Sequence, residues 1–310
     1  MNAVPSTADR TGETTDALRR TLVRKQGWAR RAPLLPALVF TVLVTQLPFV
    51  ITIWYSLNRW DFLKPGSFSF TGLSNYTKPF ADPFFREAAL HTVVIVVGTV
   101  LIGTVLGTTL ATLLDRKFLG QGVVRTLLIT PFLIMPVAAS LVWRHAFLDA
   151  TYGFVNWLLS LVGAEPVAFT TRHPLASVVA VLVWQWTPFM MLIILAGLQG
   201  QSGEVLEAAR VDGASALQTF RSITLPHLRP YMELGALLGS IYLIQTFDTV
   251  DQLAGGSPGA RNIPYFIYQR SIGGGWKFGQ ASAYGVVVVI ATIVIANLAL
   301  RLISSLLEDQ

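Results

Sequence analysis

The chain has 310 residues, of which 53% are hydrophobic and only 13% are charged, about half of the roughly 25% charged share of a soluble domain. This composition excludes a disordered chain, and the lack of any cysteine excludes a disulfide scaffold, thiol catalysis and cysteine-ligated metals. The net charge of +6 comes without a basic stripe interleaved with aromatic residues, so we expect no nucleic-acid partner. What remains is an all-α, polytopic membrane protein.

The first 31 residues are polar, rich in Ser and Thr, and end in a basic run at the start of the first apolar stretch. A signal peptide has a shorter apolar region that begins sooner, so we predict that residues 1–31 form a flexible cytoplasmic arm instead. The basic run is typical of a segment that meets anionic membrane lipid.

Six stretches are apolar enough to cross a bilayer, which takes about 20 residues of helix. The third is the shortest and holds Pro131 and Pro136, so we expect either a kink there or an earlier start, near Val123. Gly103 and Gly107 in the second permit close approach of another helix. These stretches predict six transmembrane helices in a domain over residues 32–307, followed by a short tail, 308–310. They cover residues 32–58, 92–114, 126–143, 174–198, 231–250 and 280–300.

The distribution of lysine and arginine sets the expected orientation. With the N-terminus inside, the segments on the inner side hold 14 of these residues and the outer loops hold 9. Because cytoplasmic loops carry the excess of positive charge, we predict that both termini are cytoplasmic.

The segment between the fourth and fifth stretches, residues 200–229, is too polar to span a membrane. Residues 204–211 are mostly good helix formers, with Ser202 placed to cap their start. Gly213 offers a turn at positive φ after them. The segment therefore predicts a short helix followed by a sharp turn.

A second short helix is predicted over residues 214–223, with Ser215 as its cap. Leu225–Pro226 should end it, and Pro230 should fall in the first turn of the fifth span, where a missing N–H is tolerated. Residues 200–229 are thus predicted to form a helix–turn–helix on the inner face. An ordinary cytoplasmic loop with helix-favouring alanines is the alternative interpretation of the composition alone.

The order Glu207-Ala208-Ala209, then Gly213, then Ile223-x-Leu225-Pro226 resembles the EAA–G–I-x-L-P loop of binding-protein-dependent ATP-binding-cassette (ABC) importer permeases. Asp212 and Ala214, which flank the glycine, resemble the carbohydrate-type members. The resemblance extends over roughly residues 34–302 and includes the pair Asn75-Tyr76 after the first span. It implies the type I ABC importer permease fold, in the plasma (inner) membrane of a prokaryote.

The resemblance also implies a mechanism and partners. In that family the loop's helix docks in a groove of a cytoplasmic ATPase and transmits its movement to the spans. The implied partners are a second homologous permease, two ATPase subunits and an extracytoplasmic substrate-binding protein, with ATP and Mg²⁺ bound by the ATPases. The implied coupling residues are Glu207, Ala208, Ala209, Asp212 and Gly213.

No catalytic machinery is visible in the sequence itself. It contains no G-x-x-x-x-G-K-[ST] motif for nucleotide phosphates and no H-E-x-x-H metal motif. We therefore expect no catalytic residue, metal or cofactor in this chain, and a separate polypeptide must supply the energy.

The fifth span is the richest in polar groups, which are costly within a membrane. Tyr242, Gln245 and Thr246 fall at i, i+3 and i+4, so a continuous helix would place them on one face. Asp248 would lie near the outer end, and Gln185 in the fourth span adds an amide. Such a set suits a polyhydroxylated ligand; a polar seam between the helices of two permeases is the alternative.

The resemblance, with the six predicted spans, implies the permease subunit of an ABC importer that moves a sugar or polyol by alternating access. One rival is an ion-coupled secondary carrier with Glu233 or Asp248 as its proton site. Transport by this chain alone, without nucleotide, would favour that rival. Another rival is an integral membrane lipid-modifying enzyme, which would need an acid–base cluster that the dispersed acidic residues do not supply.

Overall fold

The computed structural model describes residues 32–255 and 257–308, which are mainly helical. The predicted arm, 1–31, lies outside the described residues, and of the predicted tail only Glu308 is described, as the last residue of a helix. The chain divides into two units, residues 1–54 and 55–310. The first contains the turn η1 (Ala32–Leu34) and nearly all of helix α2 (Leu35–Ser56), which has no charged side chain, as the first predicted span requires.

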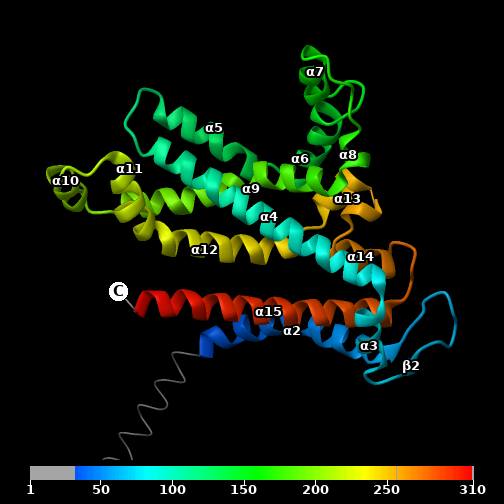
Figure 1. Ribbon diagram of the computed structural model, residues 1–310. Coiled ribbons are helices and arrows are strands. Elements are labelled where there is room, and N and C mark those ends of the chain that lie inside the picture. The colour runs from blue at the N-terminus through cyan, green and yellow to red at the C-terminus, as the bar shows by residue number, and fades with distance from the viewer. Residues whose placement is uncertain (1–31, 256, 309–310) are drawn as a thin grey trace, which may run out of the picture. The chain divides into compact units, whose positions relative to one another are not determined.

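The centre of the second unit is the pair α4 (Pro83–Leu114) and α9 (Pro174–Gln199), which run side by side along most of their length (Figure 1). A Cβ atom on Gly107 of α4 would lie 2.9 Å from the backbone nitrogen of Met191 on α9, so the close approach requires glycine at this position. The predicted packing role of Gly107 is therefore confirmed. Helix α12 (Leu225–Ile244) packs against both.

The third predicted span is sharply broken. Helix α5 (Gln121–Leu133) and α6 (Pro136–Val142), with the π-turn η2 (Trp143–Phe147), meet at a bend of 100°. Ile134 is extended at the break, and Pro136 starts α6, where its missing N–H costs nothing. The expected kink is thus a complete break between two helices at a large angle.

Short elements join the long helices. A two-stranded antiparallel hairpin, β1 (Asn58–Arg59) and β2 (Ser69–Phe70), precedes α3 (Ser74–Ala81). Buried Asn75 donates hydrogen bonds of 2.9 Å to the carbonyls of Ser56 and Asn58, which fixes the hairpin on α3. The other short elements before α9 are α7 (Phe154–Leu161) and α8 (Phe169–Arg172).

Different short helices lie at the two ends of the bundle (Figure 1). Helices α10 (Gly203–Val211) and α11 (Ala216–Thr219) lie at one end of α4, α9 and α12 (Figure 1). The opposite end carries α13 (Asp248–Ala254) and α14 (Ile263–Arg270), joined by the turn η4 (Pro258–Ala260). Helix α15 (Phe278–Glu308) follows.

The predicted fifth span, 231–250, is wrong at both ends. Helix α12 begins at Leu225 and stops at Ile244. The N–H groups of Gln245 and Thr246 bond to carbonyls three residues back, which closes the last turn. Helix α12 begins six residues before the predicted start of the span, at 231. Its 20 residues give a helix about 30 Å long, which is the thickness of the hydrocarbon core, before the predicted end of the span is reached.

Within the described residues, three helices are individually long and apolar enough to cross a membrane: α2, α4 and α9. The bent pair of α5 with α6 and η2 would be a fourth if it forms one span.

Candidate functional site

Helix α10 contains the predicted coupling residues Glu207, Ala208 and Ala209. It begins at Gly203, directly after Ser202, as the sequence predicts, but the Ser202 side chain makes no capping bond. Glu204 in the first turn is favourable there because the helix dipole is positive at its N-terminus.

The C-terminus of α10 is closed by its own backbone. Gly213 has φ of +80°, the left-handed conformation that glycine adopts without strain. Its N–H bonds to the carbonyl of Arg210, and the N–H of Ala214 bonds to that of Ala209. These two bonds form a Schellman motif, so the turn predicted at Gly213 is confirmed and Asp212 is the last residue before it.

The second predicted helix is only partly confirmed. Ser215 caps α11 in a capping box with Gln218, as the sequence predicts for its start. The predicted stop at Leu225–Pro226 is wrong, because α11 continues through the π-turn η3 (Phe220–Thr224) directly into α12. Pro226 lies where η3 joins α12, so its missing N–H removes one bond of the helical ladder there without ending the helix.

Helix α10 stands clear of the bundle. Of the five predicted coupling residues only Ala209 is buried, while Glu207, Ala208, Asp212 and Gly213 are exposed. Val211 is 87% exposed, and Val205 and Leu217 are also exposed. This end of the molecule therefore presents acidic and apolar side chains together.

The candidate substrate-path residues do not share a helix face. Tyr242 lies on α12 and is 61% exposed, but Gln245 and Thr246 follow the end of that helix. The Gln245 amide bonds back to the carbonyl of Ile241, and the carbonyl of Thr246 accepts from the side chain of Asn262. Asp248 is the exposed first residue of α13.

An aromatic wall, formed by Phe132, Trp186 and Phe189, stands beside Tyr242. Trp186 of α9 lies with its ring centroid 5.8 Å from that of Tyr242 and 5.6 Å from that of Phe132. Phe189 stacks on Phe132 at 5.4 Å. Three separate helices supply these rings, so no single-helix periodicity could have revealed them.

Gln185 occupies a structural position. Its side chain is buried, and its amide nitrogen donates 2.9 Å to the carbonyl of Ile134 at the break between α5 and α6. That carbonyl belongs to a broken helix end and requires a partner. Gln185 therefore stabilises the bend between α5 and α6 by supplying the hydrogen bond that the Ile134 carbonyl lacks within its helix.

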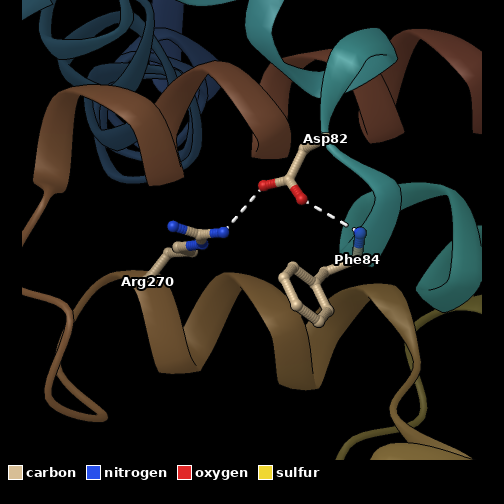
Figure 2. A network of polar contacts seen from close by, with 3 residues as sticks. All are labelled: Asp82, Phe84 and Arg270. Atoms are coloured by element: carbon tan, nitrogen blue, oxygen red, sulfur yellow. Dashed lines mark hydrogen bonds and ion pairs between the residues drawn. The ribbon is translucent and has the colours of Figure 1, made fainter.

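A polar network at the α14 end ties distant segments together, as Figure 2 shows. Asp82 caps α4 by accepting from the N–H of Phe84, and its other oxygen accepts from Arg270 of α14 at 2.7 Å. The Arg270 guanidinium also lies 5.0 Å from the ring centroid of Phe266. Asp before Pro83 is a typical N-cap signal, but nothing in the sequence pointed to Arg270 as its partner.

The turn between α12 and α13 is held by α14. Phe247 stacks on Tyr265 with ring centroids 5.9 Å apart. Burial raises the pKa of the Tyr265 phenol above its ordinary value, and the charge of nearby Asp251 raises it further, so the phenol stays neutral. Among the described residues, no three His, Cys, Asp or Glu side chains gather closely enough to hold a metal ion.

Comparison with known proteins places these features in a family. Residues 103–309 match the family described as binding-protein-dependent transport system inner membrane component. The trehalose/maltose transport system permease protein MalF of Thermococcus litoralis is 34% identical, over 73% of this chain and 77% of its own. The trehalose transport system permease protein SugA of Mycobacterium tuberculosis is 32% identical, over 86% of both chains.

The fold is also found among solved structures. A chain from the crystal structure of a bacterial ABC transporter involved in the import of the acidic polysaccharide alginate matches with a TM-score of 0.75. The match covers 93% of this chain and 99% of that one at 22% identity. It supports the arrangement of helices described above.

Proposed function

Because the chain belongs to the family of binding-protein-dependent transport system inner membrane components, we propose that it is the permease subunit of an ABC importer for a sugar or polyol. The observation that carries the substrate class is the similarity to two permeases whose names specify trehalose or maltose. The chain itself supplies a membrane pathway, and its energy comes from ATP and Mg²⁺ bound by partner ATPase subunits.

In this proposal the transmembrane domain, 32–307, crosses the membrane six times. Helix α12, with 20 residues, and α15, with 31, join α2, α4, α9 and the broken pair α5–α6. Lengths of about 20 residues match the hydrocarbon thickness. Lysine and arginine are in excess on the side of α10, so that side and both termini are cytoplasmic.

Helix α10 is the ATPase-docking element in this proposal. Its exposed Val205 and Val211 supply apolar contact area, while Glu207 and Asp212 supply charge. A helix closed by its own Schellman turn moves as one piece. Glu207, Ala208, Ala209, Asp212 and Gly213 therefore couple ATPase closure to the spans, and the spans alternate between outward- and inward-open states.

The substrate path runs past the aromatic wall. A ring such as that of Tyr242 stacks on the C–H face of a sugar, while Gln245, Thr246 and Asp248 offer hydrogen-bond partners to hydroxyls. Gln185 supports the path indirectly by holding the α5–α6 bend. A second homologous permease completes the pathway, and an extracytoplasmic binding protein delivers the sugar.

Single-cysteine cross-linking tests the docking role cleanly, because the natural chain has no cysteine. We expect a bifunctional cross-linker on Val211→Cys in the assembled transporter to capture an ATPase subunit. Tyr152→Cys is the matched control, since Tyr152 is equally exposed at 87% but precedes α7, at the other end of the bundle. Capture from both positions, or from neither, would contradict the assignment of α10.

A further inference from the structure

A cavity of about 460 Å³ lies between the β1–β2 hairpin and the start of α15. Its lining is predominantly polar and includes three cationic side chains, Arg59, Lys64 and Lys277, and one carboxylate, Asp61. None of the residues proposed for coupling or for the substrate path lines it.

The charges of this cavity are not balanced within the chain. Over the described residues, neither Arg59 nor Lys64 nor Lys277 lies within ion-pair distance of a carboxylate. Asp61 uses one carboxylate oxygen to accept from the backbone N–H of Leu63. Three cations against one carboxylate leave a positive site, and the N-terminus of α15, which directly follows Lys277, adds to the positive potential.

The two walls of the cavity are joined by backbone contacts. The N–H of Phe62 donates to the carbonyl of Trp276 at 2.9 Å, and the N–H of Gly279 donates to that of Trp60 at 3.4 Å. A Cβ atom on Gly279 would overlap the carbonyl oxygen of Asn58, so only glycine lets the walls meet. The site is therefore built before any ligand arrives.

Trp276 adds a second sign of a fixed wall. Its φ of +49° is unusual for a residue with a side chain. Its backbone N–H bonds to the Ser271 carbonyl at 2.7 Å, and its ring stacks on Phe62 with centroids 5.6 Å apart. These contacts hold the strained residue in place and so fix the backbone that carries Lys277.

The cavity lies where a membrane interface is expected. Arg59 follows the end of α2 at Ser56 closely, and Lys277 immediately precedes the apolar helix α15. The ring centroid of Trp60 lies 4.6 Å from that of Tyr55 and 5.0 Å from that of Phe278. Tyr and Trp side chains concentrate at the depth of the lipid headgroups. These rings therefore place the cationic side chains of the cavity at that depth.

We propose that this cavity binds the phosphate group of an anionic phospholipid. A phosphate neutralises clustered cations, and the arginine fork and two ammonium groups match its several oxygen atoms. A neutral sugar such as trehalose or maltose would leave the excess charge unbalanced, so the cavity does not suit the substrate class of the proposed function, on which this step rests. Free inorganic phosphate shares the chemistry of the headgroup and is the other source that the test must separate.

The test measures the binding of phosphatidylglycerol to the assembled transporter by native mass spectrometry, with phosphatidylcholine, whose choline cation cancels its phosphate charge, as the comparison of zero net charge. The test variant is R59Q/K64Q/K277Q, and the charge-matched control is R86Q/R116Q/K117Q, whose three exposed cations lie outside the cavity. At about a factor of five per cation, we expect the test variant to bind phosphatidylglycerol roughly a hundredfold more weakly. The control should bind like the natural chain.

Two further arms complete the test. K64R/K277R keeps the charges and should retain the lipid, and the single variants K64Q and K277Q should each weaken binding if the triple variant does not assemble. Equal loss in the control, or equal retention of phosphatidylcholine, would overturn the proposal. Displacement of the lipid by millimolar inorganic phosphate would overturn the lipid as the source.

Discussion

Helices α10 and α14, of nine and eight residues, lie at opposite ends of the bundle and are stabilised in different ways. Helix α10 depends on its own backbone turn and buries only Ala209. Helix α14 is capped by Asn262, tied to α4 through Arg270, and packed through Phe266. The α14 end is therefore integral to the bundle, whereas α10 leaves its surface for another molecule.

Breaking the tie at the α14 end should have the largest effect on stability. Asp82→Ala removes the cap of α4 and leaves Arg270 without its partner. The side chains of the pair are only 28% and 15% exposed, so we expect a loss of about 2–3 kcal/mol in the free energy of unfolding. Denaturant unfolding in detergent measures it.

The exposed pair Arg229–Glu233 is the control for that prediction. Its side chains are 62% and 27% exposed, and the residues are one helical turn apart. Arg229→Gln should cost at most about 0.5 kcal/mol. Similar losses in the two variants would mean that the α14 end is not the more tightly held.

A pair of glycines on α4 tests the packed body directly. Gly107→Ala places a methyl group 2.9 Å from the Met191 backbone and should destabilise by about 1–3 kcal/mol. Gly103→Ala meets nothing closer than 3.8 Å and should be neutral or slightly stabilising. Comparison of their unfolding midpoints measures the difference, and equal midpoints would contradict close packing at Gly107.

The α10 end should lose transport more than stability. Gly213→Ala forces a side chain into the left-handed conformation, which costs about 1–2 kcal/mol. We expect sugar uptake in vesicles to fall tenfold or more while the partner ATPase still hydrolyses ATP. Gly203→Ala, in the first turn of the same helix with open space around it, is the control and should keep uptake. Normal uptake by Gly213→Ala would contradict the coupling role.

The smallest effect concerns Asp149, which, like α10, is held by local backbone bonds. The N–H groups of Tyr152 and Thr151 bond to its carboxylate and hold its pKa below the ordinary value. A carboxylate whose pKa is lowered on folding stabilises the folded state at pH values above its pKa in the unfolded chain, about 4. That stability is lost as the pH falls through the pKa of the folded state. The natural chain should therefore have a slightly higher unfolding midpoint than Asp149→Asn at neutral pH, and the two midpoints should become equal in acid. A difference that persists in acid would show that the charge of Asp149 is not its cause.

The sequence predicted those elements whose signals are local. The charge-free run 174–198 became α9 because Pro174 marks its start, and Gly213 and Ser215 marked a turn and a cap correctly. Helix α4 starts nine residues before the predicted 92, because Asp82 and Pro83 begin it ahead of the charge-free run.

What the sequence missed depends on partners that are distant along the chain. Gln185 was assigned to the substrate path because its actual partner could not be seen in the sequence. The Ile134 carbonyl becomes available to Gln185 only because α5 ends there. Gln245 and Thr246 were placed on a helix that ends before them. The phosphate cavity joins Arg59 to Lys277, a relation that no local pattern contains.

The π-turn η3 has a mechanical consequence. The chain is helical without interruption from Ala216 beside α10, through η3, to Ile244 beyond Tyr242. Backbone hydrogen bonds continue through η3, so a displacement of α11 passes into α12, and η3 with Pro226 is the place where the helix axis bends. A movement of α11 should therefore shift α12, the helix that carries Tyr242 near its other end.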